Sequence, residues 1–593
     1  MFDFLKKKKS EKIKPKIISG GIKPTVLIVL DGFGIAPASD GNAITKAKTP
    51  NLDMFYSTYP HTELIASGES VGLPANEEGN SEVGHLILGS GKVILQSLKR
   101  IGKSIEDETF YDKPAFLSAI NHVTKYNSAL HLMGLVSTGK VHSDIEHFYA
   151  LLEFCRRKDI KKVYFHLFTD GRDAPPKEGV NIIREIDKRT KELKIGKIAT
   201  ISGRYYAMDR DMRWKRTQKA YEAIVSGVGP TSPSPIDAVK SAYEAGKTDE
   251  FIEPTVIVED GKPVATVDND DAVIFFNFRV DRPRQLTMAF VMEGFEKIKE
   301  FEVEAGPDHD KKERRTVRGP TFKRKKWPKN LFFVTMTQYQ KMIRVSAIAF
   351  PPIKAQVSLP KVLSDRGLRQ LHLTESEKER MVTIYFDGLH EKRLAGEDVL
   401  IVPSPKVATY DKKPEMSVYK IVAELKKALE KNVYNFIVMN FANPDMVAHS
   451  GNIKATIKAI EHVDKALGEA AEQILAYGGA LFVTADHGNA EELLTFPSKN
   501  YFFTTHEGKV NTDHSNNPVP LLVISNNFQG KPLKLPRGTL ADVAPTILTY
   551  MGMEVPDEMT GKDLLKLGRD RKKQEAPDQP SAPTPPKKDF PNI

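Results

Sequence analysis

Several Asp and His residues of the sequence stand at spacings typical of metal ligands. Asp445 and His449 occur in NPDMVAHSG, and the Asp-x-x-x-His spacing places both side chains on one face if the segment is helical. Asp486 and His487 are adjacent in TADHGNAEE, and His514 lies in TDHSNNPVP just before an apolar run. Carboxylate and imidazole groups suit divalent ions such as Mn²⁺, Zn²⁺ or Co²⁺. A single histidine is more often an ordinary core or surface residue, but this grouping favours a metal site.

Two further residues could complete a centre for phosphoryl chemistry. Asp31 follows the apolar run VLIVL and adds a carboxylate, which makes the set rich enough for two ions. Ser81 in EGNSEVGHLILGSG follows a Gly-Asn turn, so it could be a helix N-cap followed by the acidic residue Glu82. The alternative is a hydroxyl that a metal ionises, because two metals about 3.5–4 Å apart can stabilise the attacking and leaving oxygens of a phosphoryl transfer. Both interpretations of Ser81 remain open on spacing alone.

The middle of the chain contains an arginine-rich region with the character of an anion-binding site. Arginine side chains bind phosphate and carboxylate groups bidentately, and several of them converging from separate strand ends could hold a small dianion. Arg213 and Arg216 fall in an amphipathic helical pattern and are interpreted as surface salt-bridge partners. The residues favoured for anion binding lie in expected strand-end loops and are Arg172, Arg204, Arg210, Arg279 and Arg282, in a region that also contains His142 and Asp173.

The elements that must position these residues are predicted to be strands alternating with helices. Apolar runs bounded by turn residues cover 26–30, 128–135, 162–168, 197–202, 272–278, 436–442 and 480–485, and helical patterns such as 145–158 lie between them. This order predicts an α/β fold with largely parallel, buried sheets. The polar residues that follow the runs are Asp31, Asp170, Asn277, Asn443, Asp445 and Asp486. They can converge on sites, because ligands bind at the carboxyl ends of parallel strands, although any one of them could simply begin a turn.

Length and composition are those of a globular protein with more than one core. The chain has 593 residues, of which 40% are hydrophobic and 28% are charged. Its one cysteine, Cys155, excludes an internal disulfide framework and a cysteine-built zinc site, so we expect a reducing, cytoplasmic location. The first apolar run, Thr25 to Leu30, is too short for a signal peptide or a membrane span, and no membrane association is expected.

The net charge of +10 could suggest a nucleic-acid partner, but its distribution argues otherwise. Basic residues concentrate in 1–23, 297–330 and the last part of the chain, and the remainder is mildly acidic. These segments have little aromatic interleaving, so weak and sequence-independent binding is the most that they suggest. Residues 1–23 and 569–593 are predicted to be disordered, because their composition cannot bury enough apolar surface.

The motifs taken together resemble one known family. They are DGFG (31–34), GNSEVGHLILGSG (79–91), STGKVHSD (137–144), TDGRDAPP (169–176), SGRYYAMDRDMRW (202–214), FFNFRVDRPRQL (275–286), SPKVATYDKKPEMS (404–417), NFANPDMVAHSG (440–451) and ADHGNAEE (485–492). This series looks like the signatures of the cofactor-independent (2,3-bisphosphoglycerate-independent) phosphoglycerate mutases of the alkaline-phosphatase-like superfamily. It runs in family order over about residues 24–568.

The resemblance implies two domains with separate tasks. A phosphatase-like domain, residues 24–98 and 345–568, is expected to carry the metals and the serine nucleophile, and an inserted transferase domain, 99–344, is expected to hold glycerate. The expected cofactors are two divalent ions, with Mn²⁺ as the first choice. The implied ligands are Asp31, Ser81, Asp486 and His487 for one ion and Asp445, His449 and His514 for the other. The implied substrate contacts are His142, Arg172, Asp173, Arg204, Arg210, Arg279, Arg282 and Lys378, with Asp173 also acting as general base.

The expected activity is therefore the interconversion of 3- and 2-phosphoglycerate through a phosphorylated Ser81, by a monomer acting on a small molecule. A related metal-dependent phosphatase or phosphopentomutase is the main alternative, and a nucleic-acid-binding protein and a non-catalytic relative are weaker ones. The sequence departs from the family pattern in four ways, one of which is that NFRVDRPRQ carries Val280 and Pro283 between otherwise matching arginines. Residues 297–330 form a longer and more basic connection, GLPANEEGNSE precedes the serine, and TDHSNNP surrounds His514. None of these departures removes a proposed ligand or arginine.

Overall fold

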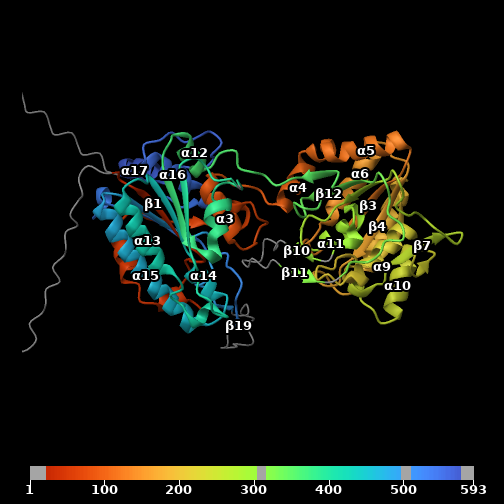
Figure 1. The fold of residues 1–593 in the computed structure, drawn as a ribbon, viewed down its shortest axis with the longest axis horizontal. Coiled ribbons are helices and arrows are strands. Elements are labelled where there is room, and N and C mark those ends of the chain that lie inside the picture. Colours follow the sequence, from red (N-terminus) through yellow and green to blue (C-terminus); the bar gives the residue numbers. More distant parts are fainter. Residues whose placement is uncertain are drawn as a thin grey trace, which may run out of the picture. The chain divides into compact units, whose positions relative to one another are not determined.

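A computed structural model describes residues 22–298, 300–303, 315–318, 320–390, 392–495 and 509–575 of the chain. These residues form two compact units (Figure 1). Unit 1 comprises the chain up to Val71, Ala75–Ile94 and the chain from Lys354 onward, and unit 2 comprises Gly72–Pro74 and Leu95–Ile353. The limits predicted from the sequence, after residue 98 and before residue 345, differ from the divisions after Ile94 and before Lys354 by four and nine residues.

Unit 1 is built on an eight-stranded sheet in the order β15-β14-β16-β1-β17-β20-β2-β21. Its centre is β1 (Thr25–Leu30), which pairs in parallel with β16 (Phe436–Phe441) on one side and β17 (Ala480–Thr484) on the other. Every residue of β1 is buried, because helices cover both faces of a largely parallel sheet, and this explains its continuous apolar sequence TVLIVL. The remaining strands are β2 (His61–Ile65), β14 (Gln370–Glu375), β15 (Glu397–Val402), β20 (Val519–Ser525) and β21 (Gly538–Thr539).

Unit 2 is built on a second sheet in the order β13-β12-β9-β3-β4-β5-β7-β6, to which β8 (Lys262–Pro263) adds at β7. The strands from β13 to β5 are parallel, and β7 runs antiparallel to β5. Their bounds are β3 (Leu130–Leu135), β4 (Val163–Thr169), β5 (Lys197–Gly203), β6 (Thr231–Ser232), β7 (Thr255–Glu259), β9 (Ala272–Phe275), β12 (Phe332–Thr337) and β13 (Ala347–Phe350). The two sheets confirm the predicted α/β class with largely parallel strands.

Helices connect the strands in both units. In unit 1 the longer ones are α2 (Pro50–Thr58), α3 (Ser81–Ser90), α13 (Val418–Lys431), α15 (Ile453–Ala476), α16 (Val543–Tyr550) and α17 (Leu564–Glu575). In unit 2 they are α4 (Ser97–Glu106), α5 (Pro114–Tyr126), α6 (Ile145–Arg157), α7 (Gly179–Leu193), α9 (Trp214–Ser226), α10 (Pro235–Glu244) and α11 (Arg284–Val291). The predicted helix at 145–158 is confirmed as α6.

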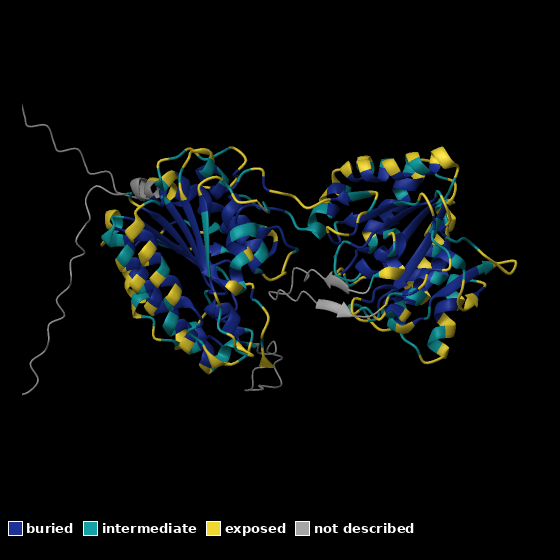
Figure 2. Cartoon of the chain, viewed as in Figure 1, coloured by how far each residue is buried: buried dark blue, intermediate teal, exposed yellow. Residues whose placement is uncertain are grey.

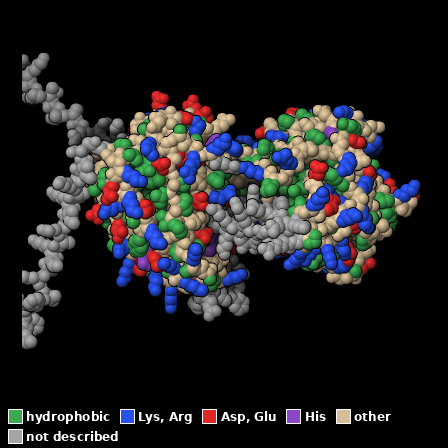
Figure 3. All heavy atoms as spheres, viewed as in Figure 1, with side chains coloured by type: hydrophobic (Ala, Val, Ile, Leu, Met, Phe, Trp, Pro, Cys, Tyr) green, Lys and Arg blue, Asp and Glu red, His purple; other side chains and the backbone are tan. Residues whose placement is uncertain are grey.

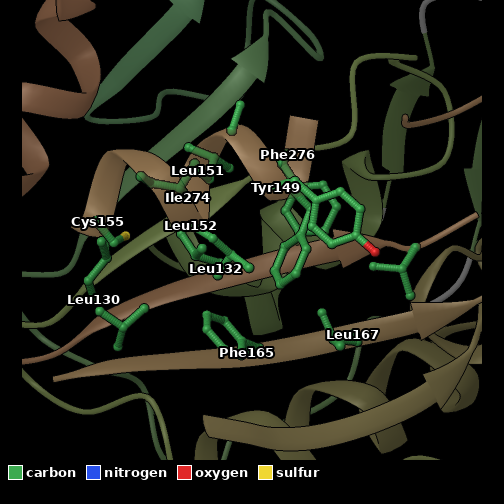
Figure 4. Close-up of a cluster of buried hydrophobic side chains, with 14 of the residues drawn as sticks. Leu130, Leu132, Tyr149, Leu151, Leu152, Cys155, Phe165, Leu167, Ile274 and Phe276 are labelled. Atoms are coloured by element: carbon green, nitrogen blue, oxygen red, sulfur yellow. The ribbon is translucent and has the colours of Figure 1, made fainter. Parts of the chain in front are cut away.

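Each sheet is the buried centre of its unit, and the exposed residues lie on the outer helix faces and loops (Figure 2). In unit 2, Leu130 and Leu132 of β3 and Phe165 and Leu167 of β4 pack against α6, whose Cys155 is fully buried (Figure 4). Burial raises the pKa of the Cys155 thiol to about 12, so this cysteine behaves as a small core residue. On the visible surface, basic and acidic side chains are interspersed (Figure 3).

The predicted appendages differ in part from the structure. The long basic connection contains an antiparallel pair, β10 (Glu300–Val303) and β11 (Arg315–Arg318), and Arg324 is buried with its guanidinium on Glu296. The disorder predicted from residue 569 is wrong at its start, because α17 continues to Glu575; its Leu564 and Leu565 are buried, and the residues after them are mostly good helix formers. Residues 1–21 and 576–593, where disorder was also predicted, lie outside the described residues.

None of the helices in the described part of the chain has both the length and the apolar composition that a membrane crossing requires.

A polar cluster is enclosed beside the edge of the unit 1 sheet. Gln370 of β14 pairs in register with Glu397 of β15, so Gln370, His372 and Glu397 share one face of the sheet. Asp387 lies against them, 1% exposed, with its Oδ1 atom 3.6 Å from His372 Nδ1. Burial, together with the charge of Glu397, raises the pKa of Asp387 to about 9, and burial lowers the pKa of His372 to about 4. Both groups are therefore expected to be neutral near pH 7.

Asp387→Asn is expected to stabilise the protein increasingly as the pH rises. In the wild type the folded state favours the protonated carboxyl of Asp387. This preference stabilises the folded state fully below the pKa of about 4 that Asp387 has in the unfolded chain, and the stabilisation is lost as the pH rises towards 9. The loss amounts to at most about 1.4 kcal/mol per pH unit. Thermal midpoints of both proteins between pH 5 and 9 measure the difference, with Asp365→Asn as an exposed control on α12 (Leu359–Asp365). A lower midpoint for Asp387→Asn at every pH would instead mean an ionised Asp387 paired with a protonated His372.

Candidate active site

The central strands of unit 1 end on the polar residues that the sequence singled out. Asp31 follows β1 and Asp486 follows β17 after a single alanine, while β16 leads into α14 (Asn443–Ala448), which carries Asp445. The three carboxylates are fully buried. Neighbouring parallel strands end at the same edge of a sheet, so the topology brings these residues together, as the sequence predicted.

Ser81 is the first residue of α3 and lies among these groups. The N-cap of α3 is Asn80, whose side chain accepts a hydrogen bond from the Val83 amide, so the N-cap interpretation of Ser81 is wrong. The Ser81 Oγ atom lies 3.0 Å from His487 Nε2 and 3.3 Å from Asp31 Oδ1. A side chain at Gly84 would meet the Asp486 carbonyl at 2.5 Å, so glycine there allows α3 to approach the β17 end closely. The serine hydroxyl is thus presented to a cluster of charged groups.

Lys378 is buried in the same cluster. Its ammonium donates to Ser81 Oγ at 2.9 Å and contacts Asp31 Oδ1 and Asp445 Oδ2 at 2.8 Å each. The resemblance implied a phosphate contact for this lysine. In the structure it sits between two carboxylates beside the serine, where it can also face a phosphoryl group on Ser81.

His449 and His514 face Asp445 with their Nε2 atoms. His449 Nδ1 lies 2.8 Å from the Thr512 carbonyl and His514 Nδ1 lies 2.8 Å from the Gly79 carbonyl. Carbonyl oxygens only accept, so in the neutral rings each Nδ1 carries the hydrogen and each Nε2 is a potential ligand. The two Nε2 atoms are 3.2 and 3.5 Å from Asp445 Oδ1. The Asp-x-x-x-His spacing therefore places Asp445 and His449 on one face, as predicted.

The donor set fits divalent cations. Asp445, His449 and His514 present ligand atoms within 4.8 Å of one another, and so do Asp31, Asp445 and His487. The Asp486 Oδ2 atom is buried and lies 3.1 Å from His85 Nδ1 and 3.6 Å from His487 Nε2. Asp445 raises the pKa of His449 to about 9, and the carboxylates around His487 raise its pKa to about 10 although burial opposes this. The cluster therefore attracts positive charge, and its oxygen and nitrogen donors are those of a divalent metal site.

Unit 2 holds the arginine cluster, which begins with Asp170 at the end of β4. Asp170 Oδ1 accepts from the backbone amides of Arg172 and Asp173 at 3.1 and 3.0 Å and from Arg204 Nη1 at 2.6 Å. Arg204 is 1% exposed and also contacts the Asp173 carboxylate. The Arg172 side chain is about half exposed and lies 3.7 Å from Glu250. Asp170 thus shapes the loop that carries Arg172 and Asp173.

The remaining members gather around Asp281. Arg210 Nη1 donates to Asp281 Oδ2 at 2.6 Å, and His142 Nδ1 and Arg279 Nε approach Asp281 Oδ1 at 3.6 and 3.5 Å. Burial and the nearby guanidinium groups of Arg204 and Arg279 lower the pKa of His142 to about 3, although the charge of Asp281 opposes this shift.

Arg282 shows that positive charge is in excess. Burial and the charges of Arg204 and Arg210 lower its pKa to about 10, and its Nε atom is buried without a hydrogen-bond partner among the described residues. Within the described part of the chain, its Nη1 donates to the Met208 carbonyl at 3.2 Å. A small anion would supply the missing partner. Arg216 instead pairs with Asp209 and stacks on Tyr205, as expected for a salt-bridge residue.

Sequence reasoning missed several polar residues that hold these groups. His85, Asn440 and Asn489 are fully buried beside the residues predicted to bind metal, and Asp281 contacts the arginines. His85 could have been found, because it follows Ser81 by one helical turn and is polar on an otherwise apolar helix face. Asn440 could not have been found, because it lies inside the strand sequence FIVMNF and not at the end of the strand, where the sequence analysis looked for polar residues.

Comparisons with known proteins agree with this geometry. A family profile described as the BPG-independent PGAM N-terminus matches residues 101–341. The 2,3-bisphosphoglycerate-independent phosphoglycerate mutase of Clostridium beijerinckii is 47% identical over 92% of this chain and 99% of its own length, and that of Moorella thermoacetica is 44% identical over the same shares. A crystal structure of Leishmania mexicana phosphoglycerate mutase, obtained at low cobalt concentration, covers 92% of this chain and 98% of its own, with a TM-score of 0.57 and 28% identity. The chain therefore belongs to the 2,3-bisphosphoglycerate-independent phosphoglycerate mutase family.

Proposed function

We propose that this mutase interconverts 3- and 2-phosphoglycerate through a phosphoserine at Ser81. Unit 1 is proposed to bind two divalent cations, with Mn²⁺ as the first choice. The observation that carries the proposal is the contact set of Ser81 Oγ, which lies within 3.3 Å of His487, Asp31 and Lys378. The proposed ligands are Asp31, Ser81, Asp486 and His487 for one cation and Asp445, His449 and His514 for the other. When bound, the cations lower the pKa of the serine hydroxyl and neutralise charge on the transferring phosphoryl group.

The proposed reaction consists of two successive displacements at phosphorus. In the first, Ser81 Oγ loses its proton and attacks phosphorus, the Oγ–P bond forms, and the bond from phosphorus to the 3-oxygen of glycerate breaks. The departing 3-oxygen takes up a proton and leaves as a hydroxyl. Lys378 lies 2.9 Å from Ser81 Oγ, so its ammonium can hold an oxygen of the phosphoryl group. In the second displacement the 2-oxygen of glycerate attacks the phosphoserine and forms a bond to phosphorus, while the bond between phosphorus and Ser81 Oγ breaks. Asp173 accepts the proton from the 2-hydroxyl, and the released Ser81 oxygen regains a proton. The reverse reaction exchanges the roles of the two hydroxyls.

The arginine cluster of unit 2 is proposed to keep glycerate bound between the two displacements. Its members are His142, Arg172, Asp173, Arg204, Arg210, Arg279 and Arg282. The excess of guanidinium charge around Arg282 supports binding of a carboxylate, and the bidentate geometry of arginine favours a fixed orientation. A phosphatase is the second candidate, since the same serine and ligands could pass phosphate to water. The arginine cluster favours the mutase, because hydrolysis needs no grip on the leaving glycerate.

Removal of metal is expected to abolish turnover reversibly. The protein is dialysed against a chelator, and 3-phosphoglycerate conversion is followed in a coupled assay without 2,3-bisphosphoglycerate. Activity is expected to fall at least about 100-fold, because the chelator removes the cations that lower the pKa of the serine hydroxyl. Activity is expected to return when Mn²⁺ is added. Elemental analysis checks the metal content in parallel. Undiminished activity in protein shown to be metal-free would contradict the metal assignment, and release of inorganic phosphate in place of 2-phosphoglycerate would favour the phosphatase.

A further inference from the structure

Two buried asparagines each hold one carboxylate of the proposed metal site. Asn440, the fifth residue of β16, donates from Nδ2 to Asp31 Oδ2 at 2.7 Å. Asn489, in the loop after β17, donates from Nδ2 to Asp445 Oδ1 at 2.8 Å. All four side chains are fully buried. A neutral amide donor fixes the plane of a carboxylate without cancelling its charge, which is the property that a metal ligand needs.

The orientation of Asn440 is itself fixed by His85. His85 Nδ1 lies 2.9 Å from the Ser81 carbonyl, which only accepts, so Nδ1 carries the hydrogen in the neutral ring. His85 Nε2 is then an acceptor, and it lies 3.1 Å from Asn440 Nδ2. Both hydrogens of the Asn440 amide therefore have acceptors, Asp31 on one side and His85 on the other. This amide cannot rotate without losing both contacts.

Asn489 is held by a different group. Its backbone amide donates to Glu491 Oε2 at 2.9 Å, and the same carboxylate accepts from the Gly34 amide at 2.9 Å and from the Ser515 hydroxyl. The two asparagines thus have independent supports. A change at one of them is not expected to move the other.

Each of the two carboxylates also presents an oxygen to a histidine of its own group, besides the contacts of both with Lys378. Asp31 Oδ1, the oxygen not bound by Asn440, is 3.5 Å from His487 Nε2. Asp445 Oδ1 has a second electron pair beyond the one used by Asn489 and lies 3.2 Å from His449 Nε2. Each asparagine therefore belongs to a different group of proposed ligands.

We propose that Asn440 and Asn489 are positioning residues, one for each cation: Asn440 aligns Asp31 for the ion at Asp31, Asp486 and His487, and Asn489 aligns Asp445 for the ion at Asp445, His449 and His514. This inference rests on the proposed two-cation site. Neither asparagine touches the substrate in this assignment, and each acts only through the carboxylate it holds.

The test measures Mn²⁺ binding to each group separately. His449→Ala leaves the Asp31 group, and His487→Ala leaves the Asp445 group. Asn440→Leu and Asn489→Leu, which keep the side-chain size but remove the donor, are placed in both backgrounds and titrated with Mn²⁺ by calorimetry. Each asparagine variant is the control for the other. Asn440→Ser and Asn489→Ser provide a second pair if a leucine variant does not fold, and the melting temperature of each metal-free protein is recorded.

A crossed pattern is expected. In the His449→Ala background, loss of Asn440 should weaken Mn²⁺ binding about 10–100-fold and loss of Asn489 should change it little, and in the His487→Ala background the order should reverse. Equal weakening at both groups, in proportion to a lowered melting temperature, would overturn the inference and leave a merely structural role. Unchanged affinities would overturn it as well. If the wild type binds no Mn²⁺ at all, the two-cation proposal fails and this inference fails with it, whereas two bound ions without the crossed pattern refute the inference alone.

Discussion

Replacing Ser81 by alanine is expected to abolish mutase turnover, by a factor of about 10⁴ or more, while the fold and the metal content remain near those of the wild type. The proposed reaction forms a bond at Ser81 Oγ, and no other hydroxyl is placed between His487, Asp31 and Lys378 in the described contacts. The substitution removes one oxygen from a largely buried position at the start of α3, whose N-cap is Asn80, so the helix should form as before.

Ser90→Ala is the matched control for this prediction. Ser90 is the last residue of the same helix, is fully buried and donates to the Lys92 carbonyl, so its loss carries a similar packing change away from the ligands. Turnover is measured in the coupled assay, and phosphoenzyme is trapped after mixing with phosphate-labelled substrate. The control should keep both signals and Ser81→Ala should lose both. Labelled phosphoenzyme in the Ser81→Ala protein would place the nucleophile elsewhere.

The strands and the first group of ligands were predictable because their signals are local. The run TVLIVL has no polar residue until Asp31, and a strand buried on both faces has that composition. The spacing of Asp445 and His449 reflects a single helical turn, so it is visible without knowledge of the rest of the fold.

The residues that align the ligands were not predictable, because their contacts join distant parts of the chain. Asn440 reaches Asp31 across two paired strands, and nothing in the sequence FIVMNF marks one polar strand residue as functional. Similarly, Asp387 becomes an unusual carboxyl only when β14 and β15 enclose it. The end of α17 was misjudged for a related reason, since composition alone does not report that buried leucines anchor the start of a helix.

Arg279→Ala and Arg282→Ala are expected to lower turnover strongly without loss of metal. Each substitution removes a charge-assisted contact to a small anionic substrate, worth roughly 1.5–3 kcal/mol, which corresponds to about a 10- to 150-fold loss. Both arginines lie in unit 2, whereas the proposed ligands all lie in unit 1, so the metal content should stay near that of the wild type. Arg184→Ala is the control, because this arginine is exposed on α7 of the same unit and contacts only Asn181 in the described hydrogen bonds.

The fate of phosphate separates a loss of substrate grip from a general loss of activity. If glycerate leaves before its second hydroxyl is phosphorylated, the phosphoserine survives long enough to react with water. The Arg279→Ala and Arg282→Ala proteins should then release a larger fraction of inorganic phosphate per turnover, and more so for Arg282, whose partly desolvated guanidinium has the stronger need for an anionic partner. Metal loss in these variants, or wild-type turnover with unchanged phosphate release, would show that residues 279 and 282 do not bind glycerate. An increase in phosphate release without metal loss would mean that the arginine cluster is what keeps the enzyme a mutase and not a phosphatase.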